Sequence, residues 1–230
     1  MIGTPHVHHR VTDSTNARAR ALAVSDAPHG TLVTAGSQTA GRGRQGRAWT
    51  AAPGEALLMS LLVRDVGPLL PLAAAVAVCE ALSPLDAAIK WPNDIWIGSG
   101  RKVAGILLEG RPQEGWAVVG IGLNVRTREF PPDLRDSATS LALEGVDTTI
   151  TAARAALLQA LDRWIASPAS EVLAAWRARD ALRGSPVSWN GGSGTAAGIA
   201  DTGSLLVDVD SGGRVELDAG EVHLTRRAGD

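Results

Sequence analysis

The sequence predicts an α+β protein in two parts, and two patterns along its 230 residues carry that prediction. Up to about residue 182, apolar or amphipathic helical segments alternate with short strands. From residue 184 onward the helical period disappears, and short alternating segments separated by Gly, Asn and Asp take its place. We therefore expect a larger mixed domain over residues 1–182 and a small antiparallel barrel or sandwich over residues 183–230.

The first part begins with a predicted helix over residues 14–24, which Asp13 or Thr12 can cap. The continuous apolar run at 56–64 predicts a strand that is buried on both faces, and the run at 69–82 predicts a core helix. Both runs are too short for a membrane span, which needs about 20 apolar residues. Further strands are expected over residues 31–35, 88–91, 95–97, 103–109 and 116–125.

After residue 125 the chain becomes polar and contains Pro131-Pro132, which predicts a loop over residues 126–136. Amphipathic periodicity then predicts helices over 151–165 and 170–182, the first of them capped by Thr149 or Thr151. The alternating segments that follow predict strands over residues 186–189, 194–199, 204–209, 214–217 and 221–224.

Composition excludes several classes of protein. The net charge is −2 and the isoelectric point about 6.2, so no overall positive field points to a nucleic-acid partner. The single cysteine, Cys79, excludes a disulfide framework and a multi-cysteine zinc site. The three histidines within residues 6–9 are expected to form an exposed polar start rather than a metal site. No targeting segment or membrane span is evident, and we expect a cytoplasmic protein.

The first candidate site is a stretch rich in glycine and arginine, Gly-Arg-Gly-Arg-Gln-Gly-Arg over residues 41–47. Its glycines allow close approach of a ligand to the backbone, and arginine binds phosphate and carboxylate through a planar fork. The stretch therefore suits a small anionic ligand such as a nucleotide. It lacks the Gly-Lys-Ser/Thr of a Walker A loop and the downstream acidic residue of a dinucleotide fold. A flexible surface loop or an RNA-binding tract stays open as an alternative.

Four further motifs place polar groups at the ends or on the backbone of predicted elements. Lys-Trp-Pro-Asn-Asp at 90–94 forms a rigid turn that brings a lysine, an amide and a carboxylate together. Lys102 opens an apolar strand in which Gly105 permits a ligand to approach the backbone closely. The glycines of Gly-Ile-Gly-Leu-Asn at 120–124 also lie within a predicted strand and permit the same approach. Asp-Ser-Thr-Asn at 13–16 supplies hydroxyl and amide groups for a neutral polar ligand. Taken singly, these motifs also fit a capped turn, a solvated strand end, a bulge and a helix cap.

The order and joint occurrence of these motifs closely resemble those of the biotin protein ligases. The resemblance covers about residues 11–145 by motif and extends to the C-terminus by architecture, with only Gly220-Glu221-Val222-x-Leu224 matching in the tail. It implies a catalytic domain like that of class II aminoacyl-tRNA synthetases, with a mixed sheet flanked by helices, over residues 1–182. A small Src-homology-3-like β-barrel over residues 183–230 is implied to follow.

The resemblance also implies a reaction in two steps. Biotin and MgATP give biotinyl-5′-AMP and pyrophosphate, and the biotinyl group then passes to a specific lysine of a biotin carboxyl carrier protein domain. The first step brings a carboxylate against a triphosphate, so fixed cations and Mg²⁺ must offset the repulsion. ATP and Mg²⁺ are thus the implied cofactors, and no protein ligand is assigned to the metal.

Site residues follow by matching position. The residues expected to be catalytic are Arg44, Lys102, Asp94 and Lys90, with Asp94 positioning or deprotonating the incoming amine. The expected biotin-binding residues are Ser14, Thr15, Asn16, Gln38, Gly41, Arg42, Gly43, Arg44, Lys102 and Gly105. The expected contacts to ATP or the adenylate are Arg42, Arg44, Arg47, Trp49, Lys102 and Asn124.

Two other functions stay open. A lipoate or octanoate ligase would share the fold and the adenylate chemistry but has a different loop pattern. A non-catalytic RNA- or ligand-binding module is disfavoured by the weakly acidic composition and the lack of interleaved aromatic residues. Because the motif at 13–16 lies almost at the start of the sequence, we expect no DNA-binding repressor domain. The oligomeric state is left open between a monomer and a homodimer.

Overall fold

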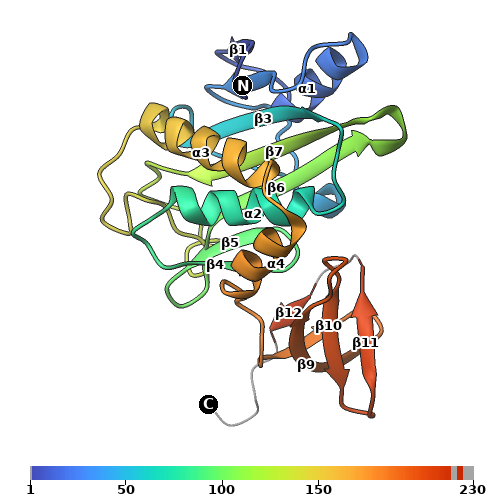
Figure 1. The fold of residues 1–230 in the computed structure, drawn as a ribbon. Coiled ribbons are helices and arrows are strands. Elements are labelled where there is room, and N and C mark those ends of the chain that lie inside the picture. The colour runs from blue at the N-terminus through green and yellow to red at the C-terminus, as the bar shows by residue number, and fades with distance from the viewer. Residues whose placement is uncertain (1, 219–221, 225–230) are drawn as a thin grey trace.

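The computed structural model describes residues 2–218 and 222–224, and its α+β architecture confirms the predicted fold class. A seven-stranded mixed sheet has the strand order β1-β2-β3-β7-β6-β5-β4. A five-stranded antiparallel sheet has the order β11-β10-β9-β8-β12. Figure 1 shows this second sheet below the first, with α4 between them.

The elements lie close to their predicted positions. The strands of the first sheet are β1 (His6–His9), β2 (Leu32–Ala35), β3 (Ala56–Arg64), β4 (Ala87–Lys90), β5 (Asp94–Ile97), β6 (Arg101–Arg111) and β7 (Trp116–Asn124). The helices are α1 (Thr15–Val24), α2 (Leu70–Ala81), α3 (Ile150–Ile165) and α4 (Ala169–Arg177), with short 3-10 turns η1 (Arg44–Gly46) and η2 (Pro112–Glu114). The strands of the second sheet are β8 (Pro186–Trp189), β9 (Gly192–Ile199), β10 (Leu205–Val209), β11 (Arg214–Leu217) and β12 (His223–Leu224).

Two elements differ from expectation, and a third is described only in part. The helix predicted over 170–182 ends at Arg177, because the chain beyond it pairs with the edge strand β4: the Ile89 N–H donates to Arg179 O at 2.7 Å. The N-terminal segment is a strand, β1, that runs parallel to β2. The last predicted strand, 221–224, is described only at His223–Leu224, since Gly220 and Glu221 of the tail motif lie outside the described residues.

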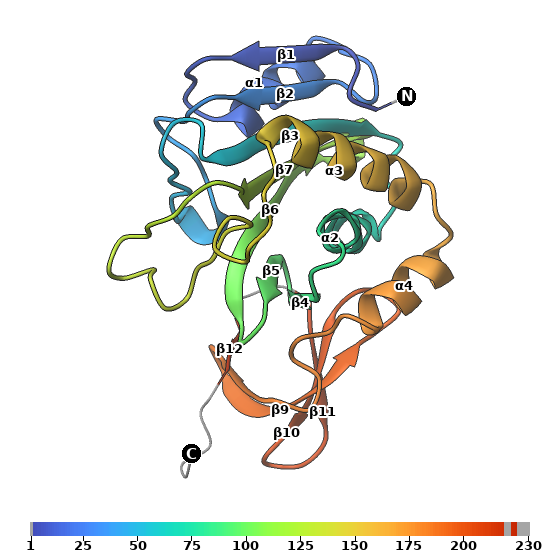
Figure 2. The ribbon, with the colours of Figure 1, turned by 90° about the vertical axis from the view of Figure 1, so that its left-hand side faces the viewer.

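The two faces of the first sheet have different partners, as the strand period of two requires. On one face Leu57, Met59 and Leu61 of β3 belong to the main core with α2 and α3, which lie together on one side of the sheet in Figure 2. On the other face Leu62 belongs to a smaller cluster with Ala19 of α1. Helix α1 covers only part of this second face, so the rest stays open for a site.

The second sheet is joined to the first by direct contacts. Trp91, which is 3% exposed, donates its indole N–H to Gly203 O at 3.1 Å. Leu182 and Leu205 belong to the same hydrophobic cluster as the core of the first sheet. The boundary predicted between residues 182 and 183 falls between α4 and β8, and the division into two domains stays a prediction.

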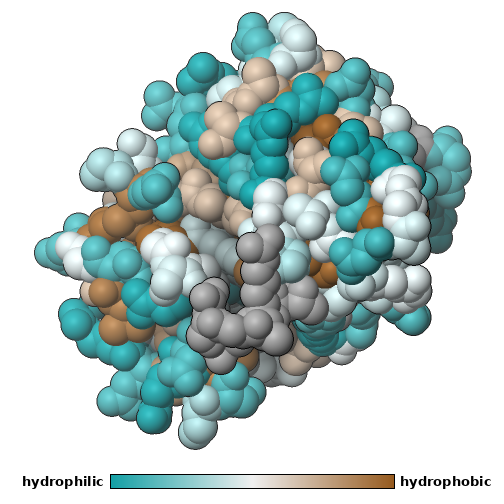
Figure 3. Space-filling view, turned by 90° about the horizontal axis from the view of Figure 1, so that it is seen from below, coloured by the Kyte–Doolittle hydropathy of each residue, from teal (hydrophilic) through white to brown (hydrophobic). Residues whose placement is uncertain are grey.

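The outer surface mixes residue types. On the face seen from below, hydrophobic residues lie in separate areas among hydrophilic ones (Figure 3). No helix within residues 2–218 and 222–224 is long and apolar enough to cross a bilayer.

Candidate functional site

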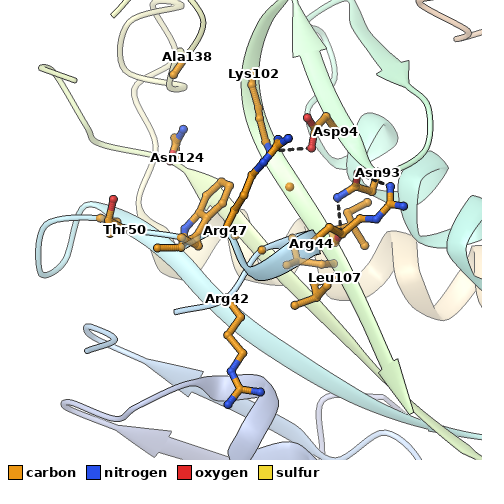
Figure 4. Close-up of a pocket in the computed structure, with 18 of the residues that line it drawn as sticks. Arg42, Arg44, Arg47, Thr50, Asn93, Asp94, Lys102, Leu107, Asn124 and Ala138 are labelled. Carbon is orange, nitrogen blue, oxygen red and sulfur yellow. Dashed lines mark hydrogen bonds and ion pairs between the residues drawn. The ribbon is translucent and has the colours of Figure 1, made fainter. Parts of the chain in front are cut away.

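A cavity of about 660 Å³ opens on the face of the first sheet that α1 leaves uncovered. Its walls come from the start of α1, the glycine- and arginine-rich loop, the turn before β5, and strands β6 and β7 (Figure 4). Every residue predicted to bind or catalyse lines this cavity except Gly41, which lines a neighbouring pocket on the same loop. The structure therefore brings the predicted residues together, while their individual roles stay predictions.

The cavity has an excess of positive charge. Its lining includes five cationic side chains and three carboxylates: Arg42, Arg44, Arg47, Lys90 and Lys102 against Glu55, Asp94 and Glu129. Lys90 and Lys102 are also the only two lysines in the whole sequence. An anionic ligand is favoured in such a cavity, because fixed cations act strongly where water is limited.

An ion pair between Lys102 and Asp94 lies at the centre of the positive wall. The Lys102 Nζ is 2.6 Å from Asp94 Oδ1 and 5.5 Å from the centre of the Trp49 ring. The two charged residues face each other because β5 and β6 form an antiparallel hairpin with a register shift after Ile95. Lys102 is thus held in place by a carboxylate on one side and an aromatic face on the other.

The turn before β5 fixes Arg44 as well. Asn93 donates from Nδ2 to Ile106 O at 2.8 Å and accepts at Oδ1 from Arg44 Nη1 at 3.3 Å. Lys90, on the other side of the turn, lies 5.3 Å from the centre of the Trp96 ring. The sequence pattern at 90–94 therefore serves to tie the arginine-containing loop to β6.

The polar end of the cavity is built around a buried hydrogen-bond chain. Gln38 Oε1 accepts from Thr15 N at 2.7 Å and from Thr15 Oγ1 at 3.1 Å. The hydroxyl of Ser60 lies 2.8 Å from Thr15 Oγ1 and 2.6 Å from Asn16 Oδ1. Thr15 and Asn16 are therefore engaged by protein groups. In the described part of the chain, no hydrogen bond engages the Ser14 hydroxyl or the Gln38 amide nitrogen, so these two can meet a ligand.

The floor of the cavity is backbone because β6 and β7 present glycines to it. Gly105 and Gly122 are paired across the two strands, and the Trp49 ring lies against both. A Cβ at Gly122 would overlap the ring, so glycine is required there. The indole Nε1 of Trp49 is buried, and it has no hydrogen-bond partner among the described residues. The Trp49 ring therefore itself occupies the side-chain-free surface that the two glycines provide.

Asn124 and Arg42, which were both expected to contact the adenylate, each interact with a protein group instead. Asn124 is 5% exposed and donates from Nδ2 to Thr139 O at 3.0 Å, so its amide holds the loop after β7. Arg42 extends away from Lys102 and Asp94 in Figure 4, and its Nη1 lies 3.8 Å from Glu109 Oε1. Its guanidinium is therefore separate from the charges at the centre of the cavity.

The loop that carries Arg42 and Arg44 has a tight, defined backbone. The Gly43 N–H donates to Arg47 O at 2.7 Å, and Trp49 N donates to Gly41 O at 3.0 Å. Gly46 has a φ of +76°, a conformation that favours glycine. A Cβ at Gly41 would overlap Trp49 O, so the glycine there allows the two limbs of the loop to approach.

Sequence reasoning missed Ser60 and Glu109 as parts of the site. Ser60 is a fully buried hydroxyl within the apolar strand β3, and that exception to the apolar run was a usable indication. Glu109 accepts from Asn16 Nδ2 at 2.9 Å and from Arg20 Nη1 at 2.9 Å. The sequence around Glu109 gives no indication of its role, because its partners lie on α1 and on the glycine- and arginine-rich loop.

Comparison with known proteins agrees with this geometry. Residues 8–125 match the model of the biotin/lipoate A/B protein ligase family. The bifunctional ligase/repressor BirA of Bacillus subtilis is 43% identical over 155 residues, which are 62% of this chain and 47% of that protein. The match thus spans about half the length of that relative.

Two further matches cover nearly the whole chain. The biotin–[acetyl-CoA-carboxylase] ligase of Mycobacterium tuberculosis is 39% identical over 241 residues, covering 93% of this chain and 86% of the relative. The solved structure of Aquifex aeolicus biotin protein ligase in complex with biotin and ATP is 28% identical, with a TM-score of 0.83 over 97% of this chain and 100% of that one. By motif order, fold and these matches, the chain belongs to the biotin protein ligases of the biotin/lipoate A/B protein ligase family.

Proposed function

We propose that this protein activates biotin with ATP and transfers it to a lysine of a biotin carboxyl carrier protein domain. The observation that carries the proposal is the Lys102–Asp94 pair, set beside a glycine floor and an arginine-containing loop in one cavity. The Aquifex neighbour, whose structure holds biotin and ATP, and the name of the mycobacterial relative support the same reading.

In the first step a biotin carboxylate oxygen attacks the α-phosphorus of ATP. A new oxygen–phosphorus bond forms, and the bond to pyrophosphate breaks. Lys102 and Arg44 lie where they can offset the negative charge that both reactants bring. We assign the Ser14 hydroxyl and the Gln38 amide N–H to binding of the neutral ureido ring at the other end of the cavity.

ATP acts as a complex with Mg²⁺, and the oxygen, nitrogen and sulfur atoms that the protein offers decide how much of that metal's coordination it can supply. Within residues 2–218 and 222–224, no group of three or more His, Cys, Asp or Glu side chains converges on one point. Phosphate oxygens would therefore supply most of the ligands of Mg²⁺, which when bound neutralises charge on the triphosphate.

In the second step the ε-amine of a carrier lysine attacks the activated acyl carbon. The amide bond forms, the bond to AMP breaks, and the amine loses a proton. Asp94 lines the cavity at the turn before β5, and we assign it to position that amine or accept the proton. The loop over residues 41–47 would cover the adenylate and keep water out.

The setting of the activity is part of the proposal. The need for ATP supports a cytoplasmic enzyme, and the net charge of −2 supports partners other than nucleic acid. A homodimer formed by sheet extension would use the edge strand β1, because the opposite edge β4 is partly covered by the bridge between Ile89 and Asp180. Light scattering of the purified protein tests that arrangement.

One experiment tests the function itself. Biotin should support exchange of radiolabelled pyrophosphate into ATP, while lipoate and octanoate should not. Exchange with lipoate alone, or with none of the three acids, would refute the proposal. Transfer is tested separately by mass spectrometry of a biotin carboxyl carrier domain, with a variant lacking its acceptor lysine as the control.

A further inference from the structure

We infer that Glu109 is a positioning residue for the biotin end of the cavity and acts through Asn16. This inference rests on the proposed function and adds a specificity-determining residue to it. Glu109 lies on β6 in the same alternation as Gly105 and Leu107, so its side chain points to the site face of the sheet. The side chain is 22% exposed, which leaves its charge only partly screened by water.

Three segments of the chain meet at this one carboxylate. Oε2 accepts from Asn16 Nδ2 at 2.9 Å, and Oε1 accepts from Arg20 Nη1 at 2.9 Å. Oε1 also lies 3.8 Å from Nη1 of Arg42. Glu109 thus joins α1, β6 and the glycine- and arginine-rich loop.

Asn16 transmits this contact to the cavity wall. Its Nδ2 donates to both Leu107 O, at 3.2 Å, and Glu109, while its Oδ1 accepts from the Ser60 hydroxyl. Both polar atoms of its side chain are therefore engaged, and the side chain lies on Gly120, where a Cβ would overlap it. Without the carboxylate, one proton of a 4% exposed amide loses its partner, and the amide can turn.

The chain of contacts continues to the groups that meet the ligand. Ser60 links Asn16 to Thr15, and Thr15 holds the Oε1 of Gln38, whose amide nitrogen has no hydrogen-bond partner among the described residues. A shift of Asn16 would therefore move the ureido end of the site. The Lys102–Asp94 pair makes no contact with Glu109, Asn16, Ser60, Thr15 or Gln38, so recognition of ATP should be affected much less.

The test separates a loss of biotin binding from a loss of protein stability or of overall activity. Pyrophosphate exchange would be measured for Glu109→Ala and Glu109→Gln, with Glu114→Gln as the matched control. Glu114 is an exposed carboxylate paired with Arg111 at the far end of the same strand. We expect Glu109→Ala to raise the KM for biotin about tenfold or more, with the KM for ATP within about twofold. Glu109→Gln, which keeps an acceptor oxygen, should recover part of the loss.

A double variant tests the route of the effect. In an Asn16→Ala background, Glu109→Ala should raise the KM for biotin little further, because its path to the ligand is already removed. Equal rises in both KM values, or a fall in kcat and melting temperature with an unchanged KM for biotin, would overturn the inference while leaving the proposed function intact. A wild-type protein that neither exchanges pyrophosphate nor binds biotin in calorimetry would overturn both.

Discussion

Lys102 and Asp94 show how closely single charges are balanced in this cavity. Each neutralises the other at 2.6 Å, so in the proposed mechanism an incoming carboxylate would compete with Asp94 for the lysine. The same competition would leave Asp94 next to the substrate, where the proposed second step would use a carboxylate. The two roles proposed for this pair are thus compatible with one contact.

Replacement of Lys102 by methionine should reduce biotin-dependent pyrophosphate exchange by about 100-fold or more, because a preorganised cation is lost where charge builds up. Arg111→Met is a suitable control, since it removes an exposed cation from the other end of β6. A Lys102→Met enzyme with near-normal exchange would contradict the assignment.

Asp94 should matter most after the adenylate has formed. Asp94→Ala is expected to slow transfer from preformed biotinyl-5′-AMP to the carrier domain by about 100-fold, because amine attack loses its acceptor or positioning group. Single-turnover transfer, followed by mass spectrometry, measures this step alone. Transfer at the wild-type rate would show that Asp94 has no part in it.

Gly122 makes room for the ring of Trp49, and the effect of filling that space can be measured. Gly122→Ala should displace the ring and change the tryptophan emission. It should also raise the KM for ATP about tenfold if the ring covers the adenine, by loss of a stacking contact. Gly67→Ala is the control, since no atom lies within 4 Å of its added Cβ. Unchanged emission in the Gly122 variant would mean that the ring does not rest there in solution.

Helices and strands were easier to predict than the contacts between them. The apolar run of β3 and the capping residue of α3 are local features, and Thr149 does accept from Ala152 N at 3.1 Å. Strand β1 was missed because its sequence is polar and its partner β2 lies far along the chain. There His6 Nε2 and His8 Nδ1 both bond the Thr34 hydroxyl, at 2.8 and 2.9 Å.

The same limit applies to the site. Motifs at 41–47 and 90–94 could be recognised because each has several unusual residues in a row. Glu109 could not be assigned in this way, since its partners lie on α1 and on the glycine- and arginine-rich loop, and the partners of Ser60 lie on α1. Only the folded chain shows that Asn16 is held by the protein and that Arg42 is directed to Glu109.

Helix α2 supplies a prediction about reactivity. Cys79 is buried in it, and burial raises the pKa of the thiol to about 12. Almost no thiolate is present at pH 8, so the native protein should not react with a disulfide reagent such as dithionitrobenzoate. One equivalent should react after unfolding in guanidinium chloride. Rapid reaction of the native protein would show that α2 opens readily.

Across the molecule, Asp180 lies where the two sheets are joined. Its Oδ1 accepts from Leu182 N at 2.9 Å, while Oδ2 is buried and has no hydrogen-bond partner in the described ranges. Burial is the main cause that raises the pKa of this carboxyl above its ordinary value. Because the folded state binds the proton more tightly, ionised Asp180 lowers the free energy of unfolding at neutral pH.

Asp180→Asn should therefore raise the melting temperature at pH 7 by a few degrees, since the amide keeps the acceptor for Leu182. The difference should shrink as the pH falls through the raised pKa, because the wild-type carboxyl then becomes neutral. Calorimetry of both proteins from pH 7 to pH 4 measures this trend. A variant that is less stable at pH 7 would contradict the sign.

The restriction of lysine to two positions has a chemical consequence for the whole protein. An acyl adenylate reacts with unprotonated amines, and in this sequence both lysine amines line the cavity while the other fixed cationic side chains are arginines. Guanidinium groups stay protonated and do not compete as nucleophiles. The rest of the surface would therefore offer few amines to the proposed adenylate. An activated ester of biotin should label only Lys90, Lys102 and the terminal amine, so that acylation of the two lysines would report on how much of the cavity is occupied by a ligand.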